Sequence, residues 1–248
     1  MVSVQLDHLT PRDWLDRQPL KPTEQVFAVF SNASSARAFK AWQCSTTAQA
    51  PSPVWAGTAY AEWEPVMPYV GIIAAESEFL EWVAATESRD WGWLAVSAAS
   101  QEVLVEHLRS LTQVLLPNGH AVFFRFWDGR FVLPILQSGE VNATQLMPVI
   151  HRCLINGQSL EIGGSALKTS RVFPWWEVSD SLLQHLGAVD TSTSINNLMQ
   201  WLSEEHPNLL EAFSAGVLRR KVETFLARPD LPSVPKAELL EYLMEELN

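Results

Sequence analysis

The first half of the chain alternates between two patterns of hydrophobic residues. Short apolar runs bounded by turn-forming residues are typical of β-strands, whereas apolar residues three or four positions apart indicate amphipathic helices. The apolar runs lie at 25–30, 69–74, 91–97 and 121–129. Helical spacing separates them and is most regular at Leu104, Leu108, Leu111 and Leu115. This order predicts an α/β lobe whose mainly parallel or mixed sheet is flanked by helices.

Helical spacing dominates the second half. From Asn142 onward, apolar residues recur at helical intervals, and Ser, Thr and Pro residues mark successive helix boundaries. The glycine-containing stretch 156–170 is predicted to form a loop or a small hairpin. Further helices are predicted at 194–205, 207–227 and 236–247. We therefore expect two domains, an α/β domain at 1–140 and an all-α helical lobe at 141–248.

The composition is that of a globular protein with an acidic surface. Hydrophobic residues make up 47% of the 248 residues and charged residues 18%, so the chain can bury a substantial core. The formal net charge is −11. Because nucleic acids and anionic membranes are bound chiefly through positive charge, we expect neither as a partner. A neutral or basic protein partner is compatible with this charge.

The cysteines and the N-terminal residues indicate where the protein resides. Cys44 and Cys153 are far apart and lack the C-x-x-C spacing of zinc or redox sites, which fits a reducing compartment. The N-terminal residues mix acidic and basic side chains without the apolar core of a secretory signal. Apolar runs such as 70–75 are far shorter than the roughly 18 residues that span a bilayer. We expect a cytoplasmic protein.

No pattern in the sequence predicts an active site. The six histidines are scattered without the spacing of metal ligands, so we expect no metal and no cofactor. Gly163-Gly164 lacks the flanking pattern of a phosphate-binding loop, and Ser165 lacks half of the G-x-S-x-G motif of hydrolases. The expectation is that the protein is not an enzyme. A small hydrolase whose residues converge only in the fold, such as His120 with Asp128, is an alternative.

The segment from Phe124 to Asp128 combines charge with aromatic rings. If it continues the strand, Arg125 and Trp127 share one face. A buried guanidinium requires a charged or hydrogen-bonding partner, which Asp128 or a carbonyl at a helix end can supply. Arg125 then either stacks on Trp127 and ties a loop to the sheet, or contacts a partner protein directly.

Two of the eleven tryptophans form a second candidate site. Trp175 and Trp176 are adjacent and follow Pro174, which favours a loop. Two neighbouring indoles do not easily face one core, so one of them is expected at the surface or in a groove. Because tryptophan is enriched at the centres of protein interfaces, the pair is a candidate partner-binding site; plugging the seam between the lobes is the alternative.

Four segments in this order resemble a known protein family. Their order and spacing, over about residues 25–140, are similar to the domain-of-unknown-function family 4123, the adaptor chaperones of bacterial type VI secretion effectors. This chain departs from the family's usual Pro-Arg after the last segment, where it has Gly129-Arg130. The segments are Val26 to Phe30, Met67-Pro68-Tyr69-Val70, Trp91-Gly92-Trp93 and Arg125-Phe126-Trp127-Asp128.

The resemblance implies a chaperone that binds a cognate secreted effector and helps to load it on the spike protein of the secretion system. It implies no catalytic residue. In this hypothesis a segment of the effector is held in a cleft between the two lobes. An immunity protein that blocks a toxin is an alternative, and the acidic charge favours it as well.

Overall fold

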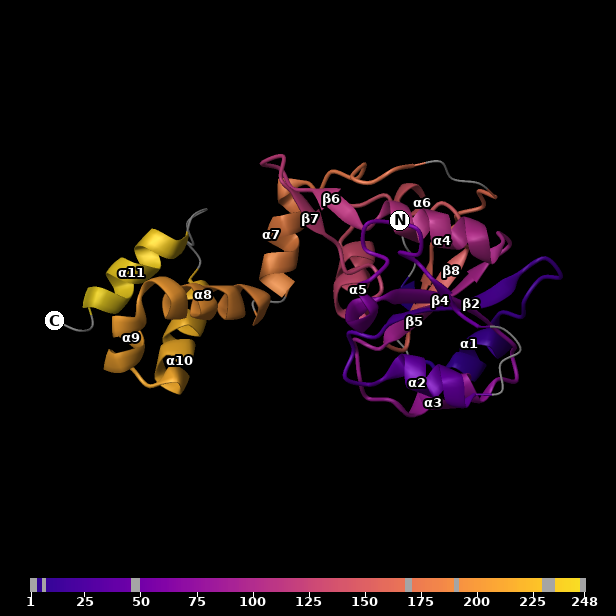
Figure 1. The fold of residues 1–248 in the computed structure, drawn as a ribbon, viewed down its shortest axis with the longest axis horizontal. Helices are drawn as coiled ribbons and strands as arrows, with labels where there is room; N and C mark the ends of the chain where they lie inside the picture. The colour runs from indigo at the N-terminus through magenta and orange to yellow at the C-terminus, as the bar shows by residue number, and fades with distance from the viewer. Residues whose placement is uncertain are drawn as a thin grey trace. The chain divides into compact units, whose positions relative to one another are not determined.

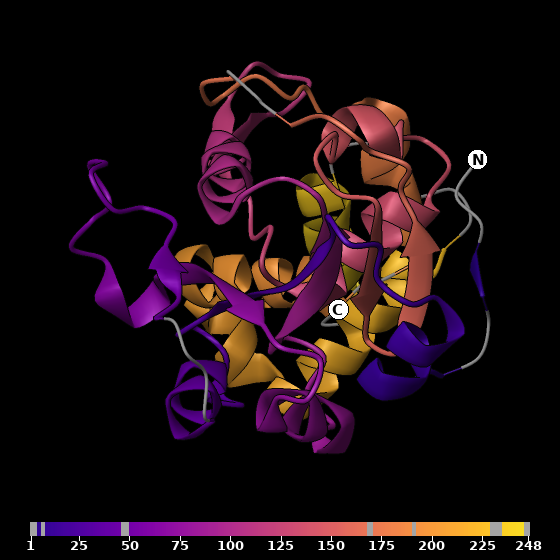
Figure 2. The same ribbon diagram turned by 90° about the vertical axis from the view of Figure 1, so that its right-hand side faces the viewer.

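The chain divides into two compact units, residues 1–183 and 184–248. The larger unit contains a β-sheet with helices on both faces, and the smaller unit contains helices (Figures 1 and 2). Within the described ranges, no helix combines the length and apolar character needed to cross a membrane. The computed structural model describes residues 4–5, 8–45, 50–167, 171–189, 192–228 and 235–245.

A seven-stranded sheet forms the centre of the larger unit in the part of the chain that the structure describes. Its order is β1-β9-β8-β5-β2-β4-β3, and every neighbouring pair is antiparallel. In the central strand β2, the residues from Val26 to Ser31 are all buried. The strands are β1 (Val4–Gln5), β2 (Gln25–Ser31), β3 (Ser52–Pro53), β4 (Pro68–Ile73), β5 (Gly92–Ser97), β8 (Arg152–Ile155) and β9 (Gln158–Glu161).

The mainly parallel or mixed sheet predicted from the sequence is wrong. β4 and β5 flank β2 on its two sides, and both run antiparallel to it, so that Phe27 pairs with Ile72 and with Ala95. A strand, helix, strand order gives parallel neighbours only when the connection crosses back over the sheet. Here the connection that contains α2 (Ala38–Cys44) returns the chain beside β2 in the opposite direction. The alternation of strands and helices along the sequence therefore does not determine whether neighbouring strands are parallel or antiparallel.

Helices cover both faces of this sheet. α1, α2 and α3 lie on one face, and α4 and α6 lie on the other (Figures 1 and 2). Phe30 of β2 packs against Trp42 of α2 and Phe79 of α3, with ring centroids 5.4 and 5.9 Å apart. These aromatic contacts join three elements in one core. The remaining bounds are α1 (Pro11–Arg17), α3 (Glu78–Ala85), α4 (Gln101–Ser110) and α6 (Ala143–Leu146).

The predicted helix at 104–115 and the predicted strand at 121–129 are both shorter in the structure. α4 ends at Ser110, and β6 (Gln113–Leu115) then pairs with β7 (Ala121–Phe123) in a separate two-stranded sheet. α5 (Gly129–Gln137) begins with Asp128 as its N-cap, which accepts a hydrogen bond from the Arg130 amide. The backbone turns into the helix directly after its N-cap, so it cannot continue to pair as a strand beyond Asp128. Arg125 and Trp127 therefore lie in the turn before α5 and not on a strand face.

Two strands occupy the region predicted to begin the all-α helical lobe. β8 and β9 form a hairpin whose turn, Asn156-Gly157, has φ values of 51° and 76°. An Asn-Gly pair adopts such positive φ values readily. Because β8 pairs with β5, the two compact units divide after Leu183, whereas the change in hydrophobic pattern predicted a domain boundary after residue 140. The predicted loop or hairpin at 156–170 starts in this hairpin, and its last residues, 168–170, lie outside the described residues.

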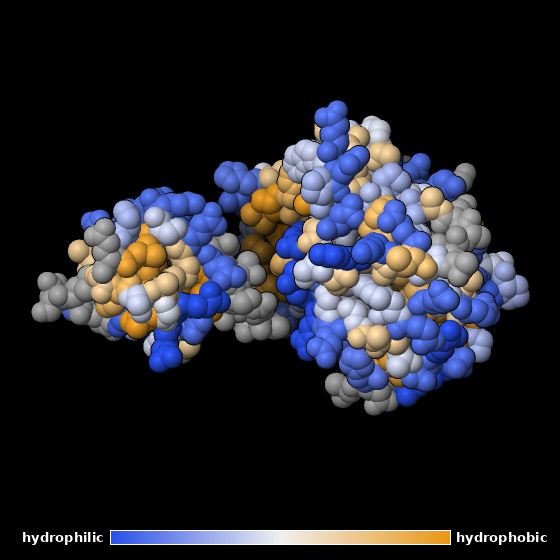
Figure 3. Space-filling model, turned by 60° about the horizontal axis from the view of Figure 1, so that its bottom comes forward, coloured by the Kyte–Doolittle hydropathy of each residue, from blue (hydrophilic) through white to orange (hydrophobic). Residues whose placement is uncertain are grey.

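The smaller unit consists, in its described part, of the end of α7 and four further helices. Its core includes Trp201, Leu218 and Phe225. The helix predicted at 207–227 is two helices, because α9 ends at Ala212 and Ser214 precedes α10. Hydrophobic residues gather on the face of this unit shown in Figure 3, with hydrophilic residues around them. The bounds are α7 (Asp180–Val189), α8 (Ser192–Glu205), α9 (Pro207–Ala212), α10 (Ala215–Leu226) and α11 (Pro235–Glu245).

Candidate functional site

Asp128 is the centre of an ion-pair network at the start of α5. Its side chain has no exposed surface, and its Oδ2 accepts from Nη2 of Arg125 at 2.9 Å and from Nη2 of Arg130 at 2.8 Å. Its Oδ1 accepts from the amide and Nε of Arg130 at 3.0 and 3.1 Å. A fully buried carboxylate is costly unless it is paired and hydrogen-bonded, and these contacts satisfy both oxygens. The Arg125–Asp128 pair suggested by the sequence is thus present.

The network continues from Arg130 to two loops near β2 and β5. Nη2 of Arg130 lies 3.3 Å from a carboxylate oxygen of Asp90. Asp90 also accepts hydrogen bonds from the hydroxyls of Ser34 and Ser88. Burial alone would raise the pKa of Asp90, but these hydrogen bonds and the charge of Arg130 together hold that pKa below its ordinary value. The network therefore ties the start of α5 to the loops that hold Ser34 and Asp90.

Trp127 packs in the interior. Its ring lies edge-on to Trp55, with centroids 5.5 Å apart, and its Nε1 has no hydrogen-bond partner among the described residues. The guanidinium of Arg125 lies over Phe131, 5.3 Å from the ring centroid, and not over Trp127 as the sequence suggested. The Arg125 side chain remains 42% exposed. Of the three residues, Arg125 alone offers surface to a partner.

Trp175 and Trp176 are both half-buried beside β6. Nε1 of Trp175 donates to the hydroxyl of Ser110 at 2.9 Å, and the guanidinium of Arg171 lies 3.9 Å from its ring centroid. Trp176 packs edge-on against Phe124 at 5.4 Å. Both indoles line a cavity of about 280 Å³. The pair thus opens into a groove, and its role in binding a partner stays a prediction.

A second group of aromatic residues is more exposed and was not singled out from the sequence. It consists of Tyr60, Trp63, Phe123 and Phe173, which we call the aromatic surface. Tyr60 lies 5.1 Å from Trp63 and 5.0 Å from Phe123, and Phe173 lies 6.2 Å from Tyr60. Trp63 is 44% exposed and Phe123 41% exposed. Because the rings are in mutual contact, they form one continuous patch.

Trp55 supports the aromatic surface from below. It is buried, and its ring lies 6.0 to 6.4 Å from those of Tyr60, Trp63 and Phe123. Its Nε1 donates to the Thr112 hydroxyl at 3.1 Å. The preceding segment is also fixed, because Nε of Arg109 donates to the Val54 carbonyl at 2.6 Å. These contacts hold the exposed rings on a rigid base.

The sequence contains a signal for this surface. The segment 54–66 has the small and turn-forming residues of a loop, yet it includes Trp55, Tyr60 and Trp63. A loop offers few core positions for three large aromatic side chains, so some of them are expected at the surface. The contribution of Phe123 and Phe173 could not be anticipated in the same way, because their proximity depends on the β6–β7 hairpin and on the segment after residue 170.

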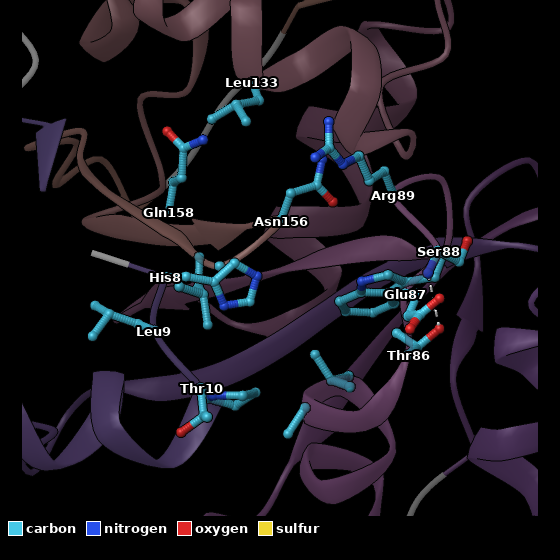
Figure 4. Close-up of a pocket in the computed structure, with 16 residues that line it drawn as sticks. His8, Leu9, Thr10, Thr86, Glu87, Ser88, Arg89, Leu133, Asn156 and Gln158 are labelled. Carbon is cyan, nitrogen blue, oxygen red and sulfur yellow. Dashed lines mark hydrogen bonds between the residues drawn. The ribbon is translucent and has the colours of Figure 1, made fainter. Parts of the chain in front are cut away.

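The larger unit also has a polar cavity of about 430 Å³, shown in Figure 4. His8 and Glu87 lie on opposite sides of it in this view, and Arg89, Asn156 and Gln158 add polar groups. No hydrogen bond or ion pair joins His8, Glu87 and Arg89 within the described ranges.

The residues considered for chemistry do not converge either. In the described part of the chain, no hydrogen bond or ion pair connects His120 with Asp128, whose carboxylate is bound by two arginines. The amides of Gly163 and Gly164 donate to the carbonyls of His151 and Ile150, so they are not free to bind an anion. Among the same residues, no group of three or more His, Cys, Asp or Glu side chains is placed to hold a metal ion.

Comparison with known proteins identifies a family for part of the chain. The family model described as Domain of unknown function (DUF4123) matches residues 26–145. This range includes Trp63, Phe123 and Asp128, whereas Trp175 and Trp176 lie beyond it. No curated protein and no solved structure matches the chain significantly. The match falls in the region where the resemblance to this family was predicted, and it leaves the adaptor role open, because the family's function is unknown. From β2 into α6, the chain is therefore similar to DUF4123.

Proposed function

We propose that this protein is a bacterial adaptor chaperone that binds a cognate type VI secretion effector and promotes its loading on the spike protein. The match of residues 26–145 to DUF4123 carries the proposal, because the resemblance in the four sequence segments implies this role. The aromatic surface supports it, since contiguous exposed aromatic rings are typical of protein-binding sites. The adaptor acts in the cytoplasm, and neither nucleic acid nor membrane is its partner.

The candidate residues take different parts in this proposal. Trp127 and Asp128 hold the loop before α5, and Arg125 contributes its exposed guanidinium to the partner. The cavity lined by Trp175 and Trp176 receives an apolar side chain of the effector. None of these residues is catalytic, because the adaptor holds a polypeptide and transforms no substrate.

Co-expression with the effector encoded beside it tests the proposal. A tagged copy of this protein should carry the effector through affinity purification and size-exclusion chromatography as a stoichiometric complex. An effector from an unrelated secretion cluster serves as the control and should not co-purify. If the cognate effector never co-purifies, and is soluble and secreted in cells that lack this protein, the adaptor function is excluded.

A toxicity assay distinguishes the adaptor from an immunity protein. Expression of this protein alone should leave cells sensitive to the toxic domain of the effector, because an adaptor does not block an active site. Survival of those cells would instead identify an immunity protein.

A further inference from the structure

The aromatic surface exposes several contiguous apolar side chains to water, which is unusual. Single exposed hydrophobic residues are common, but contiguous aromatic patches on a soluble protein mark binding sites. Trp63 and Phe123 expose 44% and 41% of their surface, and their ring centroids are only 5.4 Å apart. Because Trp55 fixes the rings from below, little conformational entropy is lost when a partner covers them.

The charge around Trp63 is one-sided. Glu62 and Glu64 flank it in the sequence, and both are exposed. Neither forms an ion pair within the part of the chain that the structure describes. The sequence has no Lys, Arg or His between Lys40 and Arg89. The edge of the surface formed by this segment therefore carries two carboxylates without an ion-pair partner in the described part of the chain, and Arg109, the cation that contacts the segment, donates to the Val54 carbonyl.

Phe123 and Phe173 form the other two edges of the aromatic surface. The arginine next to each of them in the sequence already makes a contact of its own. Arg125, two residues after Phe123, pairs with Asp128 at 2.9 Å. Arg171, two residues before Phe173, lies over the ring of Trp175. Neither is free to neutralise Glu62 or Glu64 without giving up its contact. A basic segment of another molecule would meet two carboxylates here that have no ion-pair partner among the described residues.

We infer that the aromatic surface binds an amphipathic, basic segment of the partner protein, with apolar side chains on the rings and Lys or Arg beside Glu62 and Glu64. This inference rests on the proposed adaptor function and specifies the chemistry of the effector segment. A second copy of the chain does not fit as occupant, because a symmetric interface would bring the glutamates of both copies together. An anionic membrane is repelled by the same charges.

Two synthetic peptides test the chemistry directly. One carries Leu and Phe on one face and Lys on the other, and the second has Glu in place of every Lys. The wild-type protein should bind the Lys peptide at least about 10-fold more tightly than the Glu peptide, and added salt should reduce this difference because it screens surface charges. Equal binding of the two peptides, or preference for the Glu peptide, would overturn the inference.

Matched variants locate the binding surface. Trp63→Ser combined with Phe123→Ser should weaken binding of the Lys peptide about 10-fold or more, because large exposed aromatic residues dominate interface energetics. Val217→Ser, at a side chain that is 47% exposed in the smaller unit, is the control and should change nothing. Unchanged binding in the double variant contradicts the inference.

A charge variant keeps the test valid if the aromatic variant unfolds. Glu62→Gln with Glu64→Gln alters only exposed side chains and should remove most of the salt dependence and of the preference for the Lys peptide. Glu102→Gln with Glu106→Gln, at two exposed positions of α4, serves as the charge-matched control and should leave both unchanged. Persistence of the full preference in the double glutamine variant would exclude Glu62 and Glu64 as the basis of recognition.

Effector binding and oligomeric state separate the remaining outcomes. If the wild-type protein binds the effector and the Trp63→Ser, Phe123→Ser variant binds it equally well, this inference fails while the adaptor function stands. If the wild-type protein does not bind the effector, the adaptor function itself fails. Sedimentation that shows a wild-type dimer and a monomeric variant assigns the surface to self-association and overturns the inference.

Discussion

Asp128 combines two structural tasks in one buried carboxylate. It caps α5 through the Arg130 amide and pairs with the guanidinium groups of Arg125 and Arg130. The sequence suggested the pair with Arg125, because a buried guanidinium requires a charged or hydrogen-bonding partner and Asp128 follows directly after the segment. It did not indicate the cap, because Phe124 to Trp127 have the composition of a strand. The switch from strand to helix is therefore made at this residue.

Substitutions at Asp128 and Arg125 should lower the free energy of unfolding by different amounts. Asp128→Ala removes the cap and the partner of two arginines, so the free energy of unfolding should fall by about 3 kcal/mol. Arg125→Ala should cost about 1 kcal/mol, because Arg130 still neutralises Asp128. Urea denaturation measures both, with Asp128→Asn as a variant that keeps the cap and falls between them. An Arg125→Ala cost equal to that of Asp128→Ala would contradict this assignment.

His107 should make stability depend on pH. It is fully buried in α4, and neither ring nitrogen has a hydrogen-bond partner among the described residues. Burial lowers its pKa to about 4; the backbone of Leu146 opposes this shift, and the charge of Arg171 acts in the same direction as burial. The unfolded chain, with the ordinary pKa of 6.5, then takes up a proton first as the pH falls. The stability contributed by neutral His107 is complete above pH 6.5 and is lost progressively down to about pH 4.

Urea denaturation at two pH values measures this effect. Between about pH 7.5 and about pH 5 the wild-type protein should lose about 2 kcal/mol through His107. His107→Leu cannot be protonated and should lose correspondingly less over the same range. The same pH dependence in both proteins would show that the buried imidazole is not responsible.

At the scale of elements, the apolar runs predicted the positions of the strands correctly and their relative directions incorrectly. β2, β4 and β5 lie where continuous apolar runs predicted them, because a strand covered on both faces leaves a strong hydrophobic signal. β8 was missed because Cys153 and Leu154 also fit the apolar stripe of a helix that starts at Asn142. Strand direction was wrong because it depends on how connections return to the sheet. The aromatic surface was missed although Tyr60 and Trp63 lie in one loop segment, because the contacts of that segment with Phe123 and Phe173 form only in the fold.

Gly92 shows why the Trp91-Gly92-Trp93 segment at the start of β5 requires glycine in its middle position. Its φ is +142°, and a Cβ there would lie 2.2 Å from the Val29 carbonyl oxygen of β2. Gly92→Ala should therefore lower the free energy of unfolding by about 3 kcal/mol or more. Gly119→Ala is the matched control, because φ is +78° there but no atom lies within 4 Å, so the cost should be about 1 kcal/mol. Equal thermal midpoints for the two variants would show that the contact with Val29 is relieved easily.

At the scale of the whole molecule, the unit boundary determines which fragments can fold. The larger unit extends to Leu183 because β8 and β9 complete the sheet beside β5. The predicted boundary at residue 140 cuts between β5 and its partner. It was placed there because the pattern of hydrophobic residues changes, but that change does not coincide with a break in the sheet.

Two shortened chains test this boundary. A chain that ends after Leu183 should unfold cooperatively in urea, because it retains the complete sheet. A chain that ends at residue 140 lacks β8 and β9 and should show no cooperative transition by circular dichroism. Cooperative unfolding of the shorter chain, at the midpoint of the longer one, would show that the hairpin is dispensable.

The place of the β8–β9 hairpin in the sequence affects how the protein is made. The segment similar to DUF4123 ends at residue 145, but the strand that pairs with β5 begins at Arg152. While a ribosome has released only that segment, β5 presents an open edge of the kind that joins strands of other chains. Completion of the larger unit is thus a late event in translation, and nascent chains that stall before residue 161 are the ones most exposed to aggregation.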